Sequence, residues 1–220
     1  MSLYLSEKKD ACGKAIALDD MILTTEFPTT AGSKMLDGYK SLFEAEVVTK
    51  LKNAGFDIAG KANVGELSLG LLGETSYFGA VTDENGNLAL ATSEILKTTD
   101  AFAAVGLDAG GAIRRAAAIS GQVAIKPTYG TVSRFGTVSV ACSGEAVCVT
   151  ARNAADAQSV LSAIIGHDDK DGTSHSDELC AALKKGSSHK ELRRVTLLTS
   201  MIDSVDGDIK AKLDEMRGEG

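Results

Sequence analysis

Several residue types are scarce in this sequence of 220 residues. It has two prolines, no tryptophan and 5% aromatic residues, so a core has to be built from alanine, valine, isoleucine and leucine. No apolar run approaches the ~18 residues that a membrane helix needs, and the polar N-terminus lacks the apolar region of a signal peptide. These absences predict a cytoplasmic protein that does not associate with a membrane.

Basic residues are also fewer than acidic ones. The chain carries 23 Lys and Arg residues against 30 Asp and Glu residues, which gives a formal net charge of −7. Proteins that bind nucleic acid neutralise its phosphates with clustered Lys and Arg residues. Such clusters are not expected on an acidic chain. We therefore predict no direct binding of nucleic acid.

Metal-binding patterns are missing as well. None of the four cysteines forms a Cys-x-x-Cys pair, so reduced, buried thiols are the expected state. Residues 167–178 fit a calcium loop in part, because Asp169, Asp171 and Glu178 fall at positions 3, 5 and 12, but His167 stands where the first acidic ligand belongs. The sequence predicts no metal site and no cofactor.

A glycine-rich turn stands out among the residues that are present. Residues 106–112 read Gly-Leu-Asp-Ala-Gly-Gly-Ala and lie between an apolar run and a helix-like run. Adjacent glycines at a helix start let several backbone N–H groups converge, which suits an oxyanion. Ala109, Gly110, Gly111 and Ala112 form this expected oxyanion nest, although a turn of this kind also serves purely structural purposes.

The flanking residues carry a resemblance. Residues 108–114, together with the stretch Gly-Gln-Val-Ala-Ile-Lys-Pro-Thr-Tyr-Gly-Thr-Val-Ser-Arg-Phe-Gly at 121–136, resemble the amidase signature family. The similarity is greatest to the family's A subunits of glutamyl-tRNA(Gln) amidotransferase, and it extends over 29–36 and 60–79. It implies one layered α/β domain over residues 1–220, with a mixed or mostly parallel sheet and helices on both faces. It also implies C-terminal truncation, because the chain covers about the first half of a typical member.

The same resemblance implies that three catalytic positions are replaced. The family uses a lysine base, a serine that relays the proton, and a serine nucleophile in the turn D-T-G-G-S. Asp19 stands at the lysine position and Ala112 at the nucleophile position. The glycine-serine loop of the relay is missing after Gly79, and counting back from Ala112 at the family's spacing places Leu88 at the relay position. A carboxylate, an isobutyl group and a methyl group cannot perform this acyl transfer.

Three functional hypotheses follow from these replacements. The first is a catalytically degenerate member that is retained as an interaction or ligand-binding relic. The second is an active amidase or amidotransferase subunit that uses Asp19 and Asp20 as bases and a serine in an altered geometry; the candidate serines are Ser93, Ser120, Ser133 and Ser143. The third is an interaction protein that covers an exposed sheet edge by homodimerisation or by docking on amidotransferase-type partner subunits.

Periodicity gives the expected elements. The sequence predicts helices at 44–54, 92–104, 153–165 and 177–185 and from Asp206 onward. It predicts strands at 15–23, 56–59, 123–125, 138–141, 147–150 and 195–198. Two further expectations concern packing. Asp19 sits at a solvated strand end or is paired with a donor such as Arg114, Lys126 or Arg134, and Leu88 and Ala112 share one small apolar cluster.

Overall fold

The computed structural model describes residues 2–11, 13–185 and 199–218. It comprises two compact units, Met1–Lys185 and Gly186–Gly220. The first unit holds the whole sheet, and the second contains the helices α6 (Thr199–Ile202) and α7 (Gly207–Gly218). That residues 1–220 form one domain stays a prediction, and the strand expected at 195–198 lies outside the described residues.

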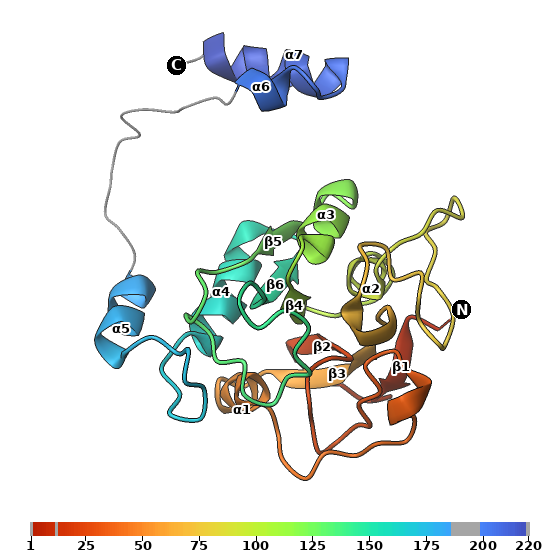
Figure 1. Cartoon of the computed structure of the whole chain (residues 1–220), viewed down its shortest axis with the longest axis vertical. Helices are drawn as coiled ribbons and strands as arrows, with labels where there is room; N and C mark the ends of the chain where they lie inside the picture. The colour runs from red at the N-terminus through yellow and green to blue at the C-terminus, as the bar shows by residue number, and fades with distance from the viewer. Residues whose placement is uncertain (1, 12, 186–198, 219–220) are drawn as a thin grey trace. The chain divides into compact units, whose positions relative to one another are not determined.

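A six-stranded mixed sheet is the centre of the first unit, and its strand order is β1-β3-β2-β4-β6-β5 (Figure 1). β2 runs parallel to both β3 and β4, whereas the pairs β1/β3, β4/β6 and β5/β6 are antiparallel. The strands are β1 (Tyr4–Glu7), β2 (Ala15–Asp19), β3 (Asp57–Ala62), β4 (Ala103–Asp108), β5 (Val123–Ile125) and β6 (Ala146–Ala151). The predicted layered α/β fold is confirmed, in its mixed rather than its mostly parallel form.

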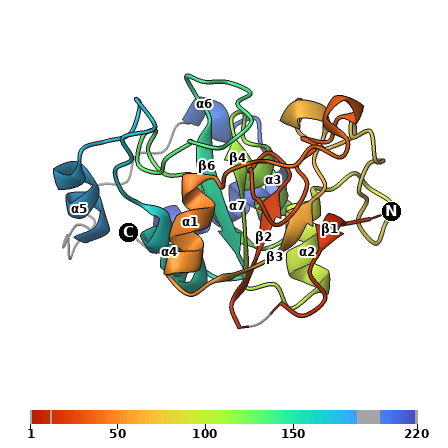
Figure 2. The ribbon, with the colours of Figure 1, turned by 90° about the horizontal axis from the view of Figure 1, so that it is seen from below.

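Helices cover both faces of this sheet (Figures 1 and 2). On one face α1 (Glu46–Asn53) packs against α4 (Ala154–Ile164), and on the other α2 (Ala91–Thr98) packs against α3 (Ala112–Ile119). The remaining elements of this unit are the short helices η1 (Lys34–Leu36) and η2 (Glu66–Ser68), and α5 (Asp177–Lys185). In the part of the chain that the structure describes, no helix is long and apolar enough to cross a membrane.

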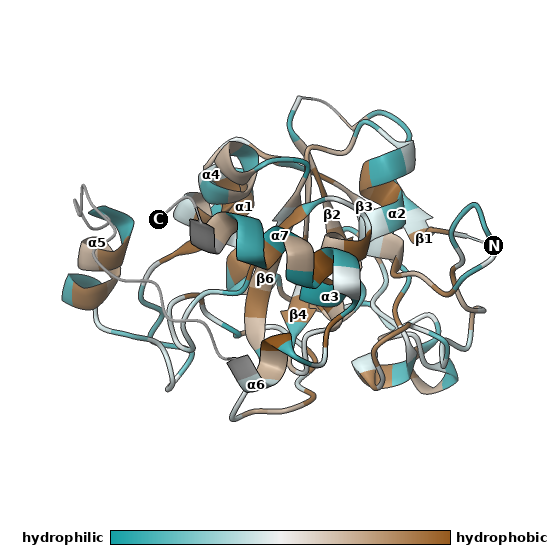
Figure 3. Ribbon diagram, turned by 90° about the horizontal axis from the view of Figure 1, so that it is seen from above, coloured by the Kyte–Doolittle hydropathy of each residue, from teal (hydrophilic) through white to brown (hydrophobic). Residues whose placement is uncertain are grey.

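Residue size differs between the two faces of the sheet. Successive strand residues point to opposite sides, and Ile16 and Leu18 of β2 join the large apolar cluster that includes α1 and α4. Ala17, between them, joins a smaller cluster with α2, in which alanines predominate. Figure 3 shows the hydropathy of the elements: strand β6 is mainly brown to pale, whereas the helix α3 alternates between brown and teal.

Two predicted elements are wrong. The helix expected at 92–104 ends at Thr98, and β4 begins at Ala103 and is buried along its whole length. Burial between two neighbouring strands overrides the helical propensity of its alanines. The strand expected at 138–141 is a loop, because the N–H groups of Val140 and Ala141 donate to the Glu145 carboxylate rather than to a neighbouring strand.

Candidate functional site

The glycine turn joins the end of β4 to the start of α3, so the helix predicted after the turn is confirmed, while the element before it is a strand. Gly111 has a φ of 101°, in the left-handed region that glycine adopts without a steric penalty. Its N–H donates to Asp108 Oδ1 at 2.8 Å, and the backbone N–H and Nε of Arg114 donate to Asp108 Oδ2 at 3.2 and 3.1 Å. The buried Asp108 carboxylate therefore occupies one of the N–H groups that the expected oxyanion nest would offer.

Asp19 lies at the last position of β2 and is 3% exposed. Its Oδ1 accepts the Met21 N–H at 2.8 Å, and its Oδ2 accepts the Leu107 N–H at 2.9 Å. Burial raises the pKa of this carboxyl to about 6, although both backbone hydrogen bonds act in the opposite direction. A strand end that is solvated is therefore wrong, whereas the alternative of a carboxylate paired with donors is confirmed, and the carboxylate links the end of β2 to β4.

The side chains proposed as partners of Asp19 are engaged elsewhere. Arg114 pairs with Asp108 at 3.1 Å, and Arg134 pairs with Glu145 at 2.9 Å. Lys126 donates to the carbonyl oxygens of Ala109 and Gly144. That part of the prediction is wrong, because each of these side chains is held by its own partners and the donors to Asp19 are backbone N–H groups.

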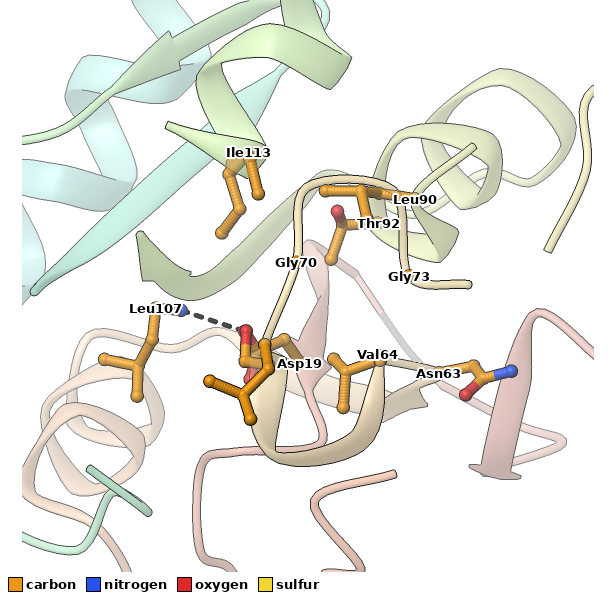
Figure 4. Close-up of a pocket in the computed structure, with 13 residues that line it drawn as sticks. Asp19, Asn63, Val64, Gly70, Gly73, Leu90, Thr92, Leu107 and Ile113 are labelled. Carbon is orange, nitrogen blue, oxygen red and sulfur yellow. Dashed lines mark hydrogen bonds between the residues drawn. The ribbon is translucent and has the colours of Figure 1, made fainter. Parts of the chain in front are cut away.

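Asp19 and Ala112 line the same small pocket, together with Leu90, Thr92 and residues of the glycine-rich loop 65–73. Figure 4 shows the Leu107 N–H donating to Asp19 beneath this pocket, with Thr92 across from it. The cavity measures about 30 Å³, which is enough for roughly two water molecules. It is too small for an amino-acid amide.

Leu88 lies outside that pocket and is 40% exposed. The expected cluster of Leu88 with Ala112 is therefore wrong, and Leu90 takes the place beside Ala112. The cause is a tight turn: Thr82 forms a bridge with Leu88, and the Asp83 carboxylate accepts the N–H groups of Asn85 and Asn87. This turn holds Leu88 on the surface.

Lys61 is a buried charge that no sequence motif singled out. Its side chain has no exposed surface, and its Nζ lies 3.0 Å from Asp20 Oδ1. It also donates to the Ile22 carbonyl at 2.6 Å and to Thr29 Oγ1 at 2.8 Å. Burial lowers the pKa of Lys61, and the neighbouring Asp20 opposes that shift. A lysine between the apolar residues of β3 is the sequence signal that could have revealed this pair.

The same pair bears on the second hypothesis. Asp20 accepts the N–H of Thr30 in addition to its ion pair with Lys61, so its carboxylate is committed to the fold. None of the four candidate serines lines the pocket of Asp19. Ser133, for example, is buried and donates to Asp168 at 2.6 Å. The expected arrangement of two aspartates with one of these serines is not present.

The stretch that partly fits a calcium loop is held by protein groups. Asp168 accepts from Ser133, and Asp171 accepts the N–H groups of Arg134 and Thr173 at 2.8 and 3.0 Å. His167 contacts the His175 carbonyl and the Asp169 carboxylate. Within the described residues, no group of three or more His, Cys, Asp or Glu side chains is arranged to hold a metal ion.

The comparisons with known proteins agree with this fold. The sequence model of the family described as Amidase matches residues 5–83 and 99–219. The A subunit of glutamyl-tRNA(Gln) amidotransferase from Corynebacterium jeikeium is 40% identical over 80% of this chain and 37% of its own length. The corresponding protein from Acinetobacter baumannii is 38% identical over 92% of this chain and 43% of its own length. The chain belongs to the amidase signature family.

A solved structure gives the same result. The crystal structure of the A subunit of glutamyl-tRNA(Gln) amidotransferase from Thermotoga maritima matches with a TM-score of 0.73 and 31% identity, over 79% of this chain and 42% of that chain. The chain thus spans about two fifths of the length of these relatives. The family match leaves out residues 84–98, the segment that contains Leu88 and all of α2.

Proposed function

We propose that this chain is a catalytically degenerate amidase-signature protein that keeps the family's fold for binding or interaction and not for amide hydrolysis. The observation that carries this proposal is the state of Asp19 at the position where the family resemblance implies a lysine base. Both of its oxygens accept backbone N–H groups, and the side chain is buried. A carboxylate held in this way has no proton-transfer partner in the neighbouring pocket.

The other two positions support the same conclusion. Ala112 offers a methyl group where the family resemblance implies the nucleophile, and the cavity in front of it has room for about two waters. The hydroxyl groups on the pocket wall belong to Ser68 and Thr92, and neither stands beside an amine base. Oxyanion stabilisation alone gives only ~10³ to 10⁴ over the uncatalysed reaction in hydrolases that lack their triad.

The test is an assay of hydrolysis on glutamine, asparagine and simple amides, together with labelling by a serine-directed acylating probe. We expect neither turnover nor labelling. Ala112→Ser is expected to stay inactive, because a serine without a base is a poor nucleophile at neutral pH. Turnover that persists in an Ala112→Gly control would show that the chain has an active site elsewhere.

Partner subunits belong to this proposal as well. The relatives are named as A subunits of an amidotransferase, and such a name implies contact with other chains. We propose that this chain associates either with itself or with amidotransferase-type subunits. Size-exclusion chromatography with light scattering tests the first possibility, and a monomer with no affinity for such subunits would contradict both.

A further inference from the structure

The segment that the family match leaves out builds a second cavity. Residues 87–90, 93, 94 and 97 line it, and all of them lie between 84 and 98. Residues 71 and 72, and the face of α3 that carries Arg115 and Ile119, complete the wall. Its volume is about 320 Å³, at the lower end of the range of small-molecule sites, ~300–1,000 Å³. The cavity is about ten times larger than the pocket beside Ala112.

One part of the wall is aliphatic and accessible. Leu71 is 45% exposed, Leu88 is 40% exposed and Ile119 is 65% exposed, and Leu72 and Leu90 lie beside them. Aliphatic surface in a concave site favours an apolar ligand group, since its burial removes that surface from water. An isolated exposed leucine would carry no such implication, but these residues converge on one cavity.

The wall carries two acidic and two basic side chains, of which Asp83 and Arg115 make no ion pair with any described residue. Glu94 pairs with Lys97 at 2.8 Å, and the Asp83 carboxylate accepts the N–H groups of Asn85 and Asn87. Arg115 is exposed and makes no ion pair or side-chain hydrogen bond with any described residue. A guanidinium group presents paired N–H donors that match the two oxygens of a carboxylate.

A buried hydroxyl group lies behind the wall. Ser93 is 1% exposed, and its Oγ has no hydrogen-bond partner among the described residues. This oxygen has no appreciable accessible surface, so a ligand in the cavity does not contact it. The cavity therefore combines an aliphatic surface with one exposed guanidinium group.

We propose that this cavity binds a small aliphatic carboxylate, with its carboxylate group at Arg115 and its tail against Leu71, Leu88 and Ile119. On the scale that gives the smaller pocket room for two waters, the volume admits about twenty water-sized groups, which is enough for an acid of about five to eight carbons. The inference rests on the proposed function in one respect, because it gives a ligand to a domain without hydrolytic chemistry. The two proposals fail separately, since one is tested by amide turnover and the other by equilibrium binding.

The experiment is a titration of the full chain with hexanoate, followed by NMR of the backbone amides. We expect saturable binding with a dissociation constant of about 1 mM, a value that is reasonable for about eight non-hydrogen atoms. Amide shifts should centre on Ser93 and Ile119. Hexanol and hexylamine, which share the tail but lack the carboxylate, should bind at least about tenfold more weakly.

Variants identify the binding groups. Arg115→Gln should weaken hexanoate binding about tenfold, and Leu88→Asp, at an exposed position, should abolish it while the fold is kept. Lys40→Gln is the matched control for charge, because Lys40 is exposed on the loop between η1 and α1, and its affinity should equal that of the wild type. Unchanged affinity in Arg115→Gln, equal binding of hexylamine, or failure of hexanoate to saturate would each overturn the proposal.

Discussion

The end of β2 and the segment 84–98 both contribute to the pocket beside Ala112, yet their side chains are accommodated in opposite ways. At the end of β2, Asp19 is buried and bonded to two backbone N–H groups. In the segment 84–98, Leu88 stays on the surface and Ser93 keeps a hydroxyl without a partner among the described residues. The first region lies inside the family match and the second lies outside it.

The difference shows which side chains the strands of the sheet can accommodate. Neighbouring strands fix the backbone N–H groups around Asp19, so a new carboxylate there finds donors that exist for geometric reasons. The turn at residues 83–87 is held mainly by hydrogen bonds among its own residues. It provides no buried site for an apolar side chain such as that of Leu88. Substitutions that disturb the contacts of Asp19 or Lys61 should therefore be costly, whereas a substitution of the exposed Leu88 should be nearly neutral.

The largest expected loss of stability is at the buried ion pair of Lys61 with Asp20. Lys61→Met leaves the Asp20 charge buried without its cation and should lower the free energy of unfolding by about 3–5 kcal/mol. Urea denaturation measures the change. The double variant Lys61→Met with Asp20→Asn should recover a substantial part of the loss, and a single variant as stable as the wild type would show that the pair is dispensable.

The next effect depends on pH and concerns Asp19. The folded pKa of about 6 lies above the ordinary value of 3.8, so the native state binds more protons than the unfolded state between those values. The stability that Asp19 contributes is present below about pH 4 and is lost as the pH rises through about 6, a change on the order of 3 kcal/mol.

Denaturation of the wild type and of Asp19→Asn across this range measures that change. Relative to the variant, the wild type should become less stable as the pH rises from about 4 to about 6.5, with a plateau above. A stability difference that stays constant with pH would mean that Asp19 titrates normally, and the contrast between the two regions would lose its main support.

A smaller loss is expected from close packing next to Asp19. A Cβ at Gly106 would lie 2.5 Å from Asp19 Oδ2 and 2.9 Å from Ile113 Cδ1. Gly106→Ala should therefore cost about 1–3 kcal/mol of stability. Gly144→Ala is the control, because a Cβ there meets no atom within 4 Å. Equal melting temperatures for the two variants would disprove the close approach of β4 to Asp19.

The smallest effect tests the segment 84–98. A Leu88 packed against Ala112 would make Leu88→Ser lower the melting temperature, but at 40% exposure the change should alter stability by less than about 0.5 kcal/mol. Thermal denaturation compares it with Leu90→Ser, which removes a half-buried side chain from the pocket of Ala112 and should cost more. A large loss in Leu88→Ser alone would reverse the contrast.

Local patterns predicted much of the fold. Asn153 caps α4 by accepting the Asp156 N–H, as the capping-box spacing indicates, and the strands at 123–125 and 146–151 appear where β-branched residues alternate. The glycine turn likewise needed only the sequence. That positions 19 and 112 replace catalytic residues stays a prediction, which rests on the matched motifs on both sides. These features depend on neighbours along the chain.

Other features were decided by the tertiary structure alone, because they depend on contacts between residues that are distant along the chain. The sequence predicts residues 103 and 104 as the end of a helix, but the structure places them in β4, between β2 and β6. Of the two donors to Asp19, Met21 is two residues away along the chain, whereas Leu107 is 88 positions away. The ion pair of Lys61 with Asp20 and the exposed position of Leu88 also follow from contacts that no local pattern encodes. Propensity acts within a few residues, whereas burial and hydrogen-bond partners are set by whichever strands the fold brings together.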